Sequence, residues 1–163
     1  MKSNKLCSVV KWLIANSSRL ILALVLIFSG IVKLIDPHGT EYKIEDYALS
    51  FGVSEFLPIY APLVLAIALA MFEFCMGVNL LFVINRRLTS TLVLIFLTIF
   101  TPFTLYLAIE NPVHDCGCFG DAWKLTNWQT FIKNVILLTS AIIMTMYHKL
   151  QSRLISIHSQ WLV

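Results

Sequence analysis

Residues 88–109 read LTSTLVLIFLTIFTPFTLYLAI, a run that contains no charged side chain. A helix needs about 20 mostly apolar residues to cross the hydrocarbon core of a bilayer. Because that core holds no water, the backbone must satisfy its own hydrogen bonds, as a helix does. The segment is therefore predicted to be a transmembrane helix.

Three further segments carry the same signal, at approximately residues 20–35, 57–84 and 128–147. Two of them also show helix-start signals. Pro62 suits the opening turn of the second span, and the spacing of Thr126 and Gln129 is typical of a capping box before the fourth. We therefore predict an all-α fold, an integral membrane four-helix bundle that forms one transmembrane domain over residues 1–163.

The composition of the whole chain agrees with this class. Of the 163 residues, 58% are apolar and only 13% are charged, whereas soluble domains carry about 25% charged residues. A net charge of +3 gives no indication of nucleic-acid binding. A glycine-rich nucleotide fingerprint is also missing from the sequence. The lipid bilayer is the partner that the composition predicts.

The charged residues give the spans a direction. Basic residues precede the first span, fill the turn between the second and third spans, and follow the fourth; they include Lys2, Lys5, Lys11, Arg19, Arg86, Arg87, Lys149 and Arg153. Apart from Glu73, the acidic residues all fall in the other two connecting segments. Because basic residues collect on the cytoplasmic side, we expect both termini to be cytoplasmic in a bacterial inner membrane.

The first segment on the outward side is expected to contain a short extra helix. Apolar residues occur there at positions 44, 47, 48 and 51, which is helical spacing. Such a helix would lie over the end of the bundle.

The second outward segment, residues 110–127, carries a pair of thiols. Cys116 and Cys118 are separated only by Gly117. A disulfide across so small a ring retains strain, and strained disulfides are more oxidising. His114 would stabilise a thiolate when it is protonated, and the periplasm permits disulfides. The pair is a candidate redox site, and if the protein is an enzyme it is a thiol-disulfide oxidoreductase.

Two other interpretations of this segment remain open. His114, Cys116 and Cys118 could bind a metal with His38 as a fourth ligand, although structural zinc sites usually separate their cysteines by two to four residues; we predict no metal site. Alternatively, the thiol segment is structural and the protein is a non-enzymatic scaffold that holds a partner during its assembly.

Glu73 is the ionisable residue nearest the middle of a predicted span. Such a residue is by default a functional hypothesis, here an intramembrane polar site or a transport pathway. The alternative is a protonated carboxyl that supports packing. Lys33 either snorkels to the membrane surface or approaches Glu73, although their estimated depths differ by about two helical turns. Cys75 is expected to be a small buried residue.

Small residues near these charges, including Ser29, Gly30 and Gly77, favour close contact between helices. Together with the thiol segment they complete a set of motifs. The set comprises residues 28–34 (FSGIVKL), Asp36-Pro37, Tyr47, Glu73-x-x-x-Gly77 and residues 115–120 (DCGCFG).

With these motifs the chain resembles the DoxX-like superfamily of small four-helix membrane proteins, and most closely its methylamine-utilisation branch, the MauE family. The resemblance implies an inner-membrane protein of thiol redox chemistry. MauE is associated with maturation of methylamine dehydrogenase, and other superfamily members with quinone-coupled thiosulfate oxidation. The resemblance thus implies a periplasmic client or a thioredoxin-like partner, and a quinone as a possible electron acceptor.

Overall fold

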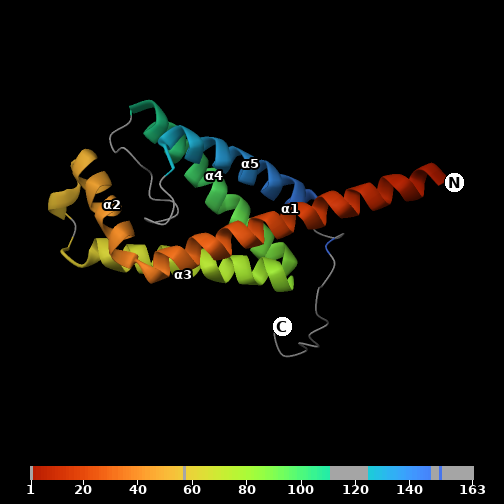
Figure 1. Ribbon diagram of the computed structural model, residues 1–163, viewed down its shortest axis with the longest axis horizontal. Helices are drawn as coiled ribbons and strands as arrows, with labels where there is room; N and C mark the ends of the chain where they lie inside the picture. Colours follow the sequence, from red (N-terminus) through yellow and green to blue (C-terminus); the bar gives the residue numbers. More distant parts are fainter. Residues whose placement is uncertain (1, 57, 111–124, 148–150, 152–163) are drawn as a thin grey trace.

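The computed structural model describes residues 2–56, 58–110, 125–147 and 151, which form a single helical bundle (Figure 1). In chain order the elements are α1 (Lys2–Ile35), α2 (Pro37–Ser50), the 3₁₀ turn η1 (Ser54–Phe56), α3 (Ala61–Phe82), α4 (Arg86–Glu110) and α5 (Asn127–Met146). The described part of the chain contains no β-strand.

Four of these helices are long and apolar enough to cross a membrane. The candidate spans are Ser8–Ile35, Ala61–Phe82, Arg86–Glu110 and Asn127–Met146. The extra helix between the first two spans is also present, as α2. The predicted fold class, an all-α membrane four-helix bundle with one short additional helix, is confirmed.

The bundle has two distinct ends (Figure 1). The α2 end holds α2, the last residues of α1 and α4, and the first residues of α3 and α5. The opposite end holds the turn between α3 and α4, where Arg86 and Arg87 begin α4; we name it the basic end. Connecting segments that are far apart in the sequence therefore lie together, either at the α2 end or at the basic end.

Helix α1 begins well before the apolar run that starts at residue 20. No glycine or proline occurs between residues 2 and 29, so nothing in the sequence interrupts the helix. Its first turns project past the basic end (Figure 1), and residues 8–14 are all exposed.

Local side-chain bonds fix the helix starts. The Thr126 hydroxyl accepts from the backbone N–H of Gln129 at 3.3 Å, and the Gln129 side chain accepts from the Thr126 N–H at 3.1 Å. The predicted capping box is thus confirmed. At the start of α2, the Asp36 carboxylate accepts from the N–H of Gly39 at 3.1 Å. Pro62 lies in the first turn of α3, as expected.

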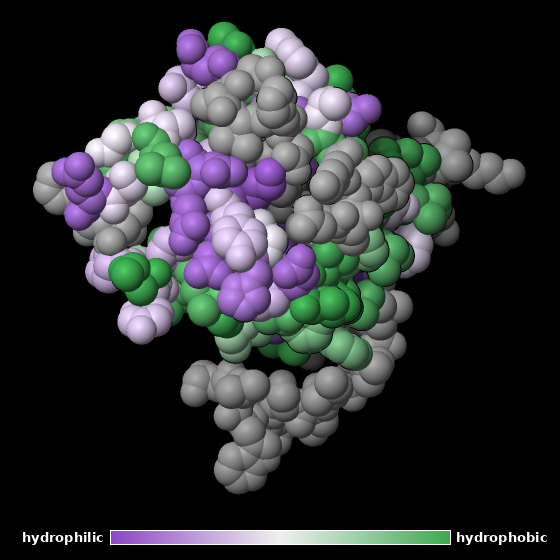
Figure 2. Space-filling view, turned by 60° about the vertical axis from the view of Figure 1, so that its left-hand side comes forward, coloured by the Kyte–Doolittle hydropathy of each residue, from purple (hydrophilic) through white to green (hydrophobic). Residues whose placement is uncertain are grey.

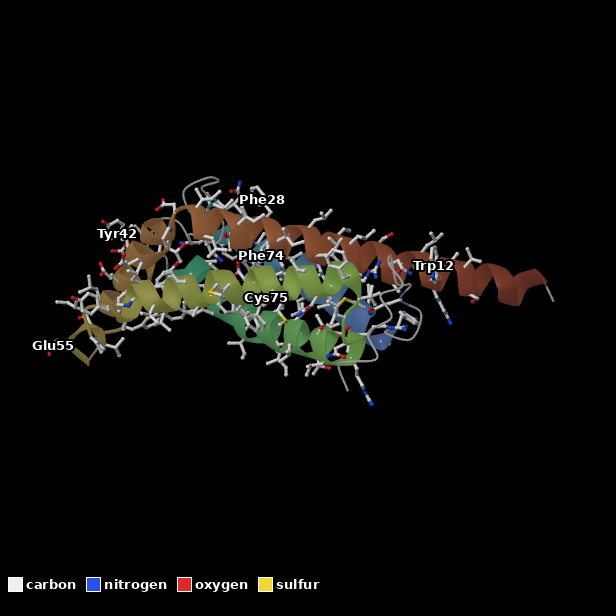
Figure 3. The ribbon with its side chains drawn as sticks, turned by 90° about the horizontal axis from the view of Figure 1, so that it is seen from below. Trp12, Phe28, Tyr42, Glu55, Phe74 and Cys75 are labelled. Atoms are coloured by element: carbon white, nitrogen blue, oxygen red, sulfur yellow. The ribbon has the colours of Figure 1, made fainter. Side chains whose placement is uncertain are left out.

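Helices α1 and α3 approach each other almost backbone to backbone. A Cβ atom on Gly30 would lie 2.7 Å from the backbone nitrogen of Phe74, and one on Gly77 would lie 2.8 Å from that of Ile27. Phe74 lies at the edge of α3 that faces α1 (Figure 3). Because lipid supplies no hydrophobic drive between helices, such close packing is what holds them together.

The remaining helices close the bundle around one apolar core. It is built from all four spans, and its fully or nearly fully buried members are Leu22, Ala23, Leu26, Leu80, Val93, Leu97, Leu137, Ala141 and Met144.

We predict that Gly30→Ala destabilises the protein by about 1–3 kcal/mol, because its methyl group overpacks the α1–α3 contact. The control Ala68→Val adds bulk to an exposed position of α3 and should leave stability nearly unchanged. The measurement is unfolding by sodium dodecyl sulfate in mixed micelles. Equal midpoints for Gly30→Ala and the unmodified protein would contradict the packing described.

Candidate functional site

A buried ion pair joins α1 to α3 inside the bundle. The Lys33 ammonium donates to both Glu73 carboxylate oxygens, at 2.7 and 2.8 Å, and to the Ser29 hydroxyl at 3.3 Å. The side chains of Lys33 and Glu73 are only 4% and 7% exposed. The three ammonium hydrogens all have acceptors, so the charge of Lys33 is fully satisfied within the protein.

The two charges meet because α1 and α3 are offset along their length. Gly30 lies opposite Phe74 and Gly77 lies opposite Ile27, so the end of α1 falls near Leu69. The first two turns of α3, approximately, therefore extend past α1 and lie against α2. The depths of Lys33 and Glu73 estimated from the sequence did not include this offset, so they placed the two side chains about two helical turns apart. The alternative in which Lys33 snorkels to the surface is wrong.

A cavity of about 40 Å³ adjoins the ion pair where the four spans meet. Its polar lining comes from three helices, with Ser29 and Lys33 on α1, Glu73 on α3, and Lys133 and Asn134 on α5. The amide of Asn134 donates to the Thr104 hydroxyl of α4 at 3.2 Å. Polar groups from three spans thus line one small space, and Asn134 links this set to Thr104 of the fourth.

A chain of aromatic rings leads from this cavity to α2. Phe96 and Phe100 line the cavity and lie 4.4 Å apart between ring centroids. Phe103 follows at 6.3 Å from Phe100, and Tyr47 of α2 packs edge-on against Phe103 at 5.7 Å. This contact was not predicted from the sequence, although the i, i+4, i+7 spacing of the three phenylalanines indicates one helix face. The rings hold α2 against the bundle.

The thiol pair, Cys116 and Cys118, and the neighbouring His114 lie outside the described residues, so their geometry stays a prediction. The end of α4 and the start of α5, which flank that segment, lie at the α2 end (Figure 1). The segment therefore leaves from and returns to the end of the bundle opposite Arg86 and Arg87.

Cys75 corrects an expectation from the sequence. It is exposed and free rather than buried, and it is labelled in Figure 3. Two residues correspond to about 200° around a helix, so Cys75 points away from the face on which Glu73 and Gly77 meet α1.

His38, considered above as a fourth metal ligand, lies in the first turn of α2. Its Nδ1 is 2.6 Å from the Glu41 carboxylate, and the imidazole is largely exposed. Within residues 2–56, 58–110, 125–147 and 151, no three metal-ligating side chains come together.

The two hollows in the α2 half of the bundle are small for a quinone. The cavity beside the ion pair, about 40 Å³, is far smaller than the roughly 300–1,000 Å³ of usual small-molecule sites. A second hollow of about 230 Å³ lies between α2 and the start of α3, with Glu45, Ser54, Pro58 and Ile59 among its lining residues. It too falls below that range, so no electron-transfer step through a quinone follows from these two hollows. A third hollow, of about 520 Å³, lies at the basic end beside Asn85, Arg86, Arg87 and Leu88.

Charge separates the two ends of the bundle. Hydrophilic residues gather on the face at the α2 end (Figure 2). The described acidic residues of that end are Asp36, Glu41, Glu45, Asp46, Glu55 and Glu110. Arg86 and Arg87 lie at the other end. The described acidic residues other than Glu73 thus lie at the α2 end, which also carries Lys43, whereas Arg86 and Arg87 lie at the opposite end.

The chain matches a protein family. The model of the family described as "Methylamine utilisation protein MauE" matches residues 10–147, a range that runs from α1 to the residue after α5. No curated protein and no solved structure matches the chain.

We predict that Lys33→Met lowers the free energy of unfolding by about 3–5 kcal/mol, because it leaves Glu73 buried without its counter-charge. Replacing both residues, Lys33→Met with Glu73→Met, should recover most of that loss. Unfolding by sodium dodecyl sulfate in mixed micelles measures all three proteins. If Lys33→Met alone were as stable as the unmodified protein, the pair would contribute nothing to the stability of the bundle.

Proposed function

Because the chain belongs to the MauE family, we propose that it is a multi-pass membrane protein whose Cys116–Cys118 pair exchanges disulfides with proteins outside the cytoplasm. One observation carries the proposal. The segment that contains both thiols joins α4 to α5, and its described flanks lie at the α2 end of the bundle. In this proposal the bundle presents the closely spaced thiol pair at one membrane surface.

The charge distribution supports the proposed orientation. Arg86 and Arg87 lie at the end away from the flanks of the thiol segment, and basic residues near the spans favour the cytoplasmic side. In a bacterial inner membrane the α2 end then faces the periplasm, and both termini face the cytoplasm. The periplasm is kept oxidising, which suits a pair that must be oxidised to act.

The proposed reaction is a thiol-disulfide exchange. A thiolate of the client protein attacks the Cys116–Cys118 disulfide, which forms a mixed disulfide and releases the other cysteine as a thiolate. The second client thiolate then resolves the mixed disulfide. The client loses two electrons, and its two thiol protons pass to the leaving thiolates of Cys116 and Cys118.

The pair must then be oxidised again. We propose that the oxidant is the disulfide of a thioredoxin-like partner, which takes up the two electrons and two protons by the same exchange. A glycine between the cysteines permits the tight ring, while the remaining strain favours donation of the disulfide to a client. His114, when protonated, would stabilise the thiolate that leaves.

The family's description points to methylamine utilisation. We propose that the client is an exported protein of that process which needs several disulfides to mature.

A scaffold is the second candidate function, and the rigidity of the described bundle favours it. The Lys33–Glu73 pair ties α1 to α3, and rings of α2 and α4 pack together. A firmly held α2 could seat a partner during assembly without any thiol chemistry.

We predict that a membrane-impermeant maleimide, added to spheroplasts, labels Cys116 and Cys118 only after reduction. The pair should rest as a disulfide in an oxidising compartment. Peptide mass spectrometry reads each cysteine separately, and Cys75, which is exposed on α3 within a membrane span, is the internal control that should stay unlabelled with and without reductant. Full labelling of the pair without reductant would overturn the proposal.

Replacing both thiols, Cys116→Ser with Cys118→Ser, separates the two candidates, with Cys75→Ser as the matched control. Loss of disulfides in the client at normal membrane levels of the variant supports exchange. Normal client maturation supports the scaffold instead.

A further inference from the structure

We propose that the cavity beside the Lys33–Glu73 pair is a water-binding site, in which ordered water links the Glu73 carboxylate to the Asn134 amide. The proposal concerns the membrane interior and is independent of the thiol pair. It rests on the size of the cavity, the polarity of its lining, and the hydrogen-bonding positions that the protein leaves for water.

The cavity is large enough and polar enough to hold water. Its volume is about 40 Å³, whereas one water needs about 10–15 Å³, so two or three can fit. Cavities lined only by apolar side chains stay dry, but water enters where it finds two to four polar partners. Ser29, Lys33, Glu73, Lys133 and Asn134 all contribute to this lining.

The Glu73 carboxylate and the Asn134 amide both keep hydrogen-bonding positions that their described hydrogen bonds leave unoccupied. A carboxylate has about four acceptor positions, and Lys33 fills two of those on Glu73. The amide of Asn134 has about four positions as well, of which the bond to Thr104 takes one. A buried carboxylate that keeps acceptor positions in an apolar medium is costly, so water in the adjoining space lowers the free energy of the pair.

The position of the cavity gives this water a structural role. Glu73 belongs to α3, which packs closely on α1, while Asn134 belongs to α5, which packs on α4. No direct hydrogen bond between Glu73 and the α4–α5 pair occurs among the described residues. The water therefore provides the polar link between the two halves of the bundle.

Radiolytic footprinting in ¹⁸O-water tests the site directly, because hydroxyl radicals formed from bound water label the side chains beside it. Leu97 and Leu137 line the cavity. Leu22 and Leu107 are also buried, with exposed fractions of 0% and 1% against 3% and 5% for the first two, but they do not line it. We expect at least about threefold more ¹⁸O incorporation at the first two leucines than at the second two. Equal incorporation at all four leucines would overturn the proposal.

Two variants show what holds the water. Asn134→Leu fills the cavity, and Lys33→Met with Glu73→Met removes the charged partners, so both should reduce labelling of Leu137 to the level of Leu22. Thr101→Val is the control, since its hydroxyl bonds only within α4 and it does not line the cavity. Labelling that persists in both variants would contradict the site; if either variant fails to fold, the four leucines of the unmodified protein still decide.

Discussion

Two opposite charges buried in an apolar bundle have to meet, and this constraint sets the register of α1 against α3. Lys33 reaches Glu73 only because Gly30 and Gly77 let the two backbones approach. A shift of one turn, about 5.4 Å along the axis, would separate the charges and drive Cβ or side-chain atoms into the opposite helix. The ion pair and the glycines thus specify the same arrangement, one by electrostatics and the other by shape.

The rest of the bundle follows from that register. Because α3 extends past the end of α1, its first turns offer a surface on which α2 packs, and the aromatic rings of α4 hold α2 from the other side. The ion pair, the cavity and these rings lie in sequence toward the α2 end. The flanks of the thiol segment lie at that same end, so the polar interior and the proposed redox surface belong to one half of the molecule.

The sequence predicted what depends on local pattern. Apolar run length predicted four spans, Thr126 and Gln129 predicted a helix start, and the spacing around Tyr47 predicted α2. It could not predict what depends on how helices are offset in space. Counting residues inward from each span start left Lys33 and Glu73 apart, because that count assumes helices that begin level. The exposure of Cys75 and the ring contacts of Phe103 likewise depend on which face of each helix meets its neighbour.

The central claim is that the bundle separates its basic end from its thiol segment by the full thickness of the membrane. Alkaline phosphatase, which is active only after export, tests this claim when fused after Glu110 and, separately, after Val163. The account predicts high activity for the first fusion and background activity for the second, since the proposed orientation places both termini in the cytoplasm. High activity after Val163 together with background activity after Glu110 would contradict it.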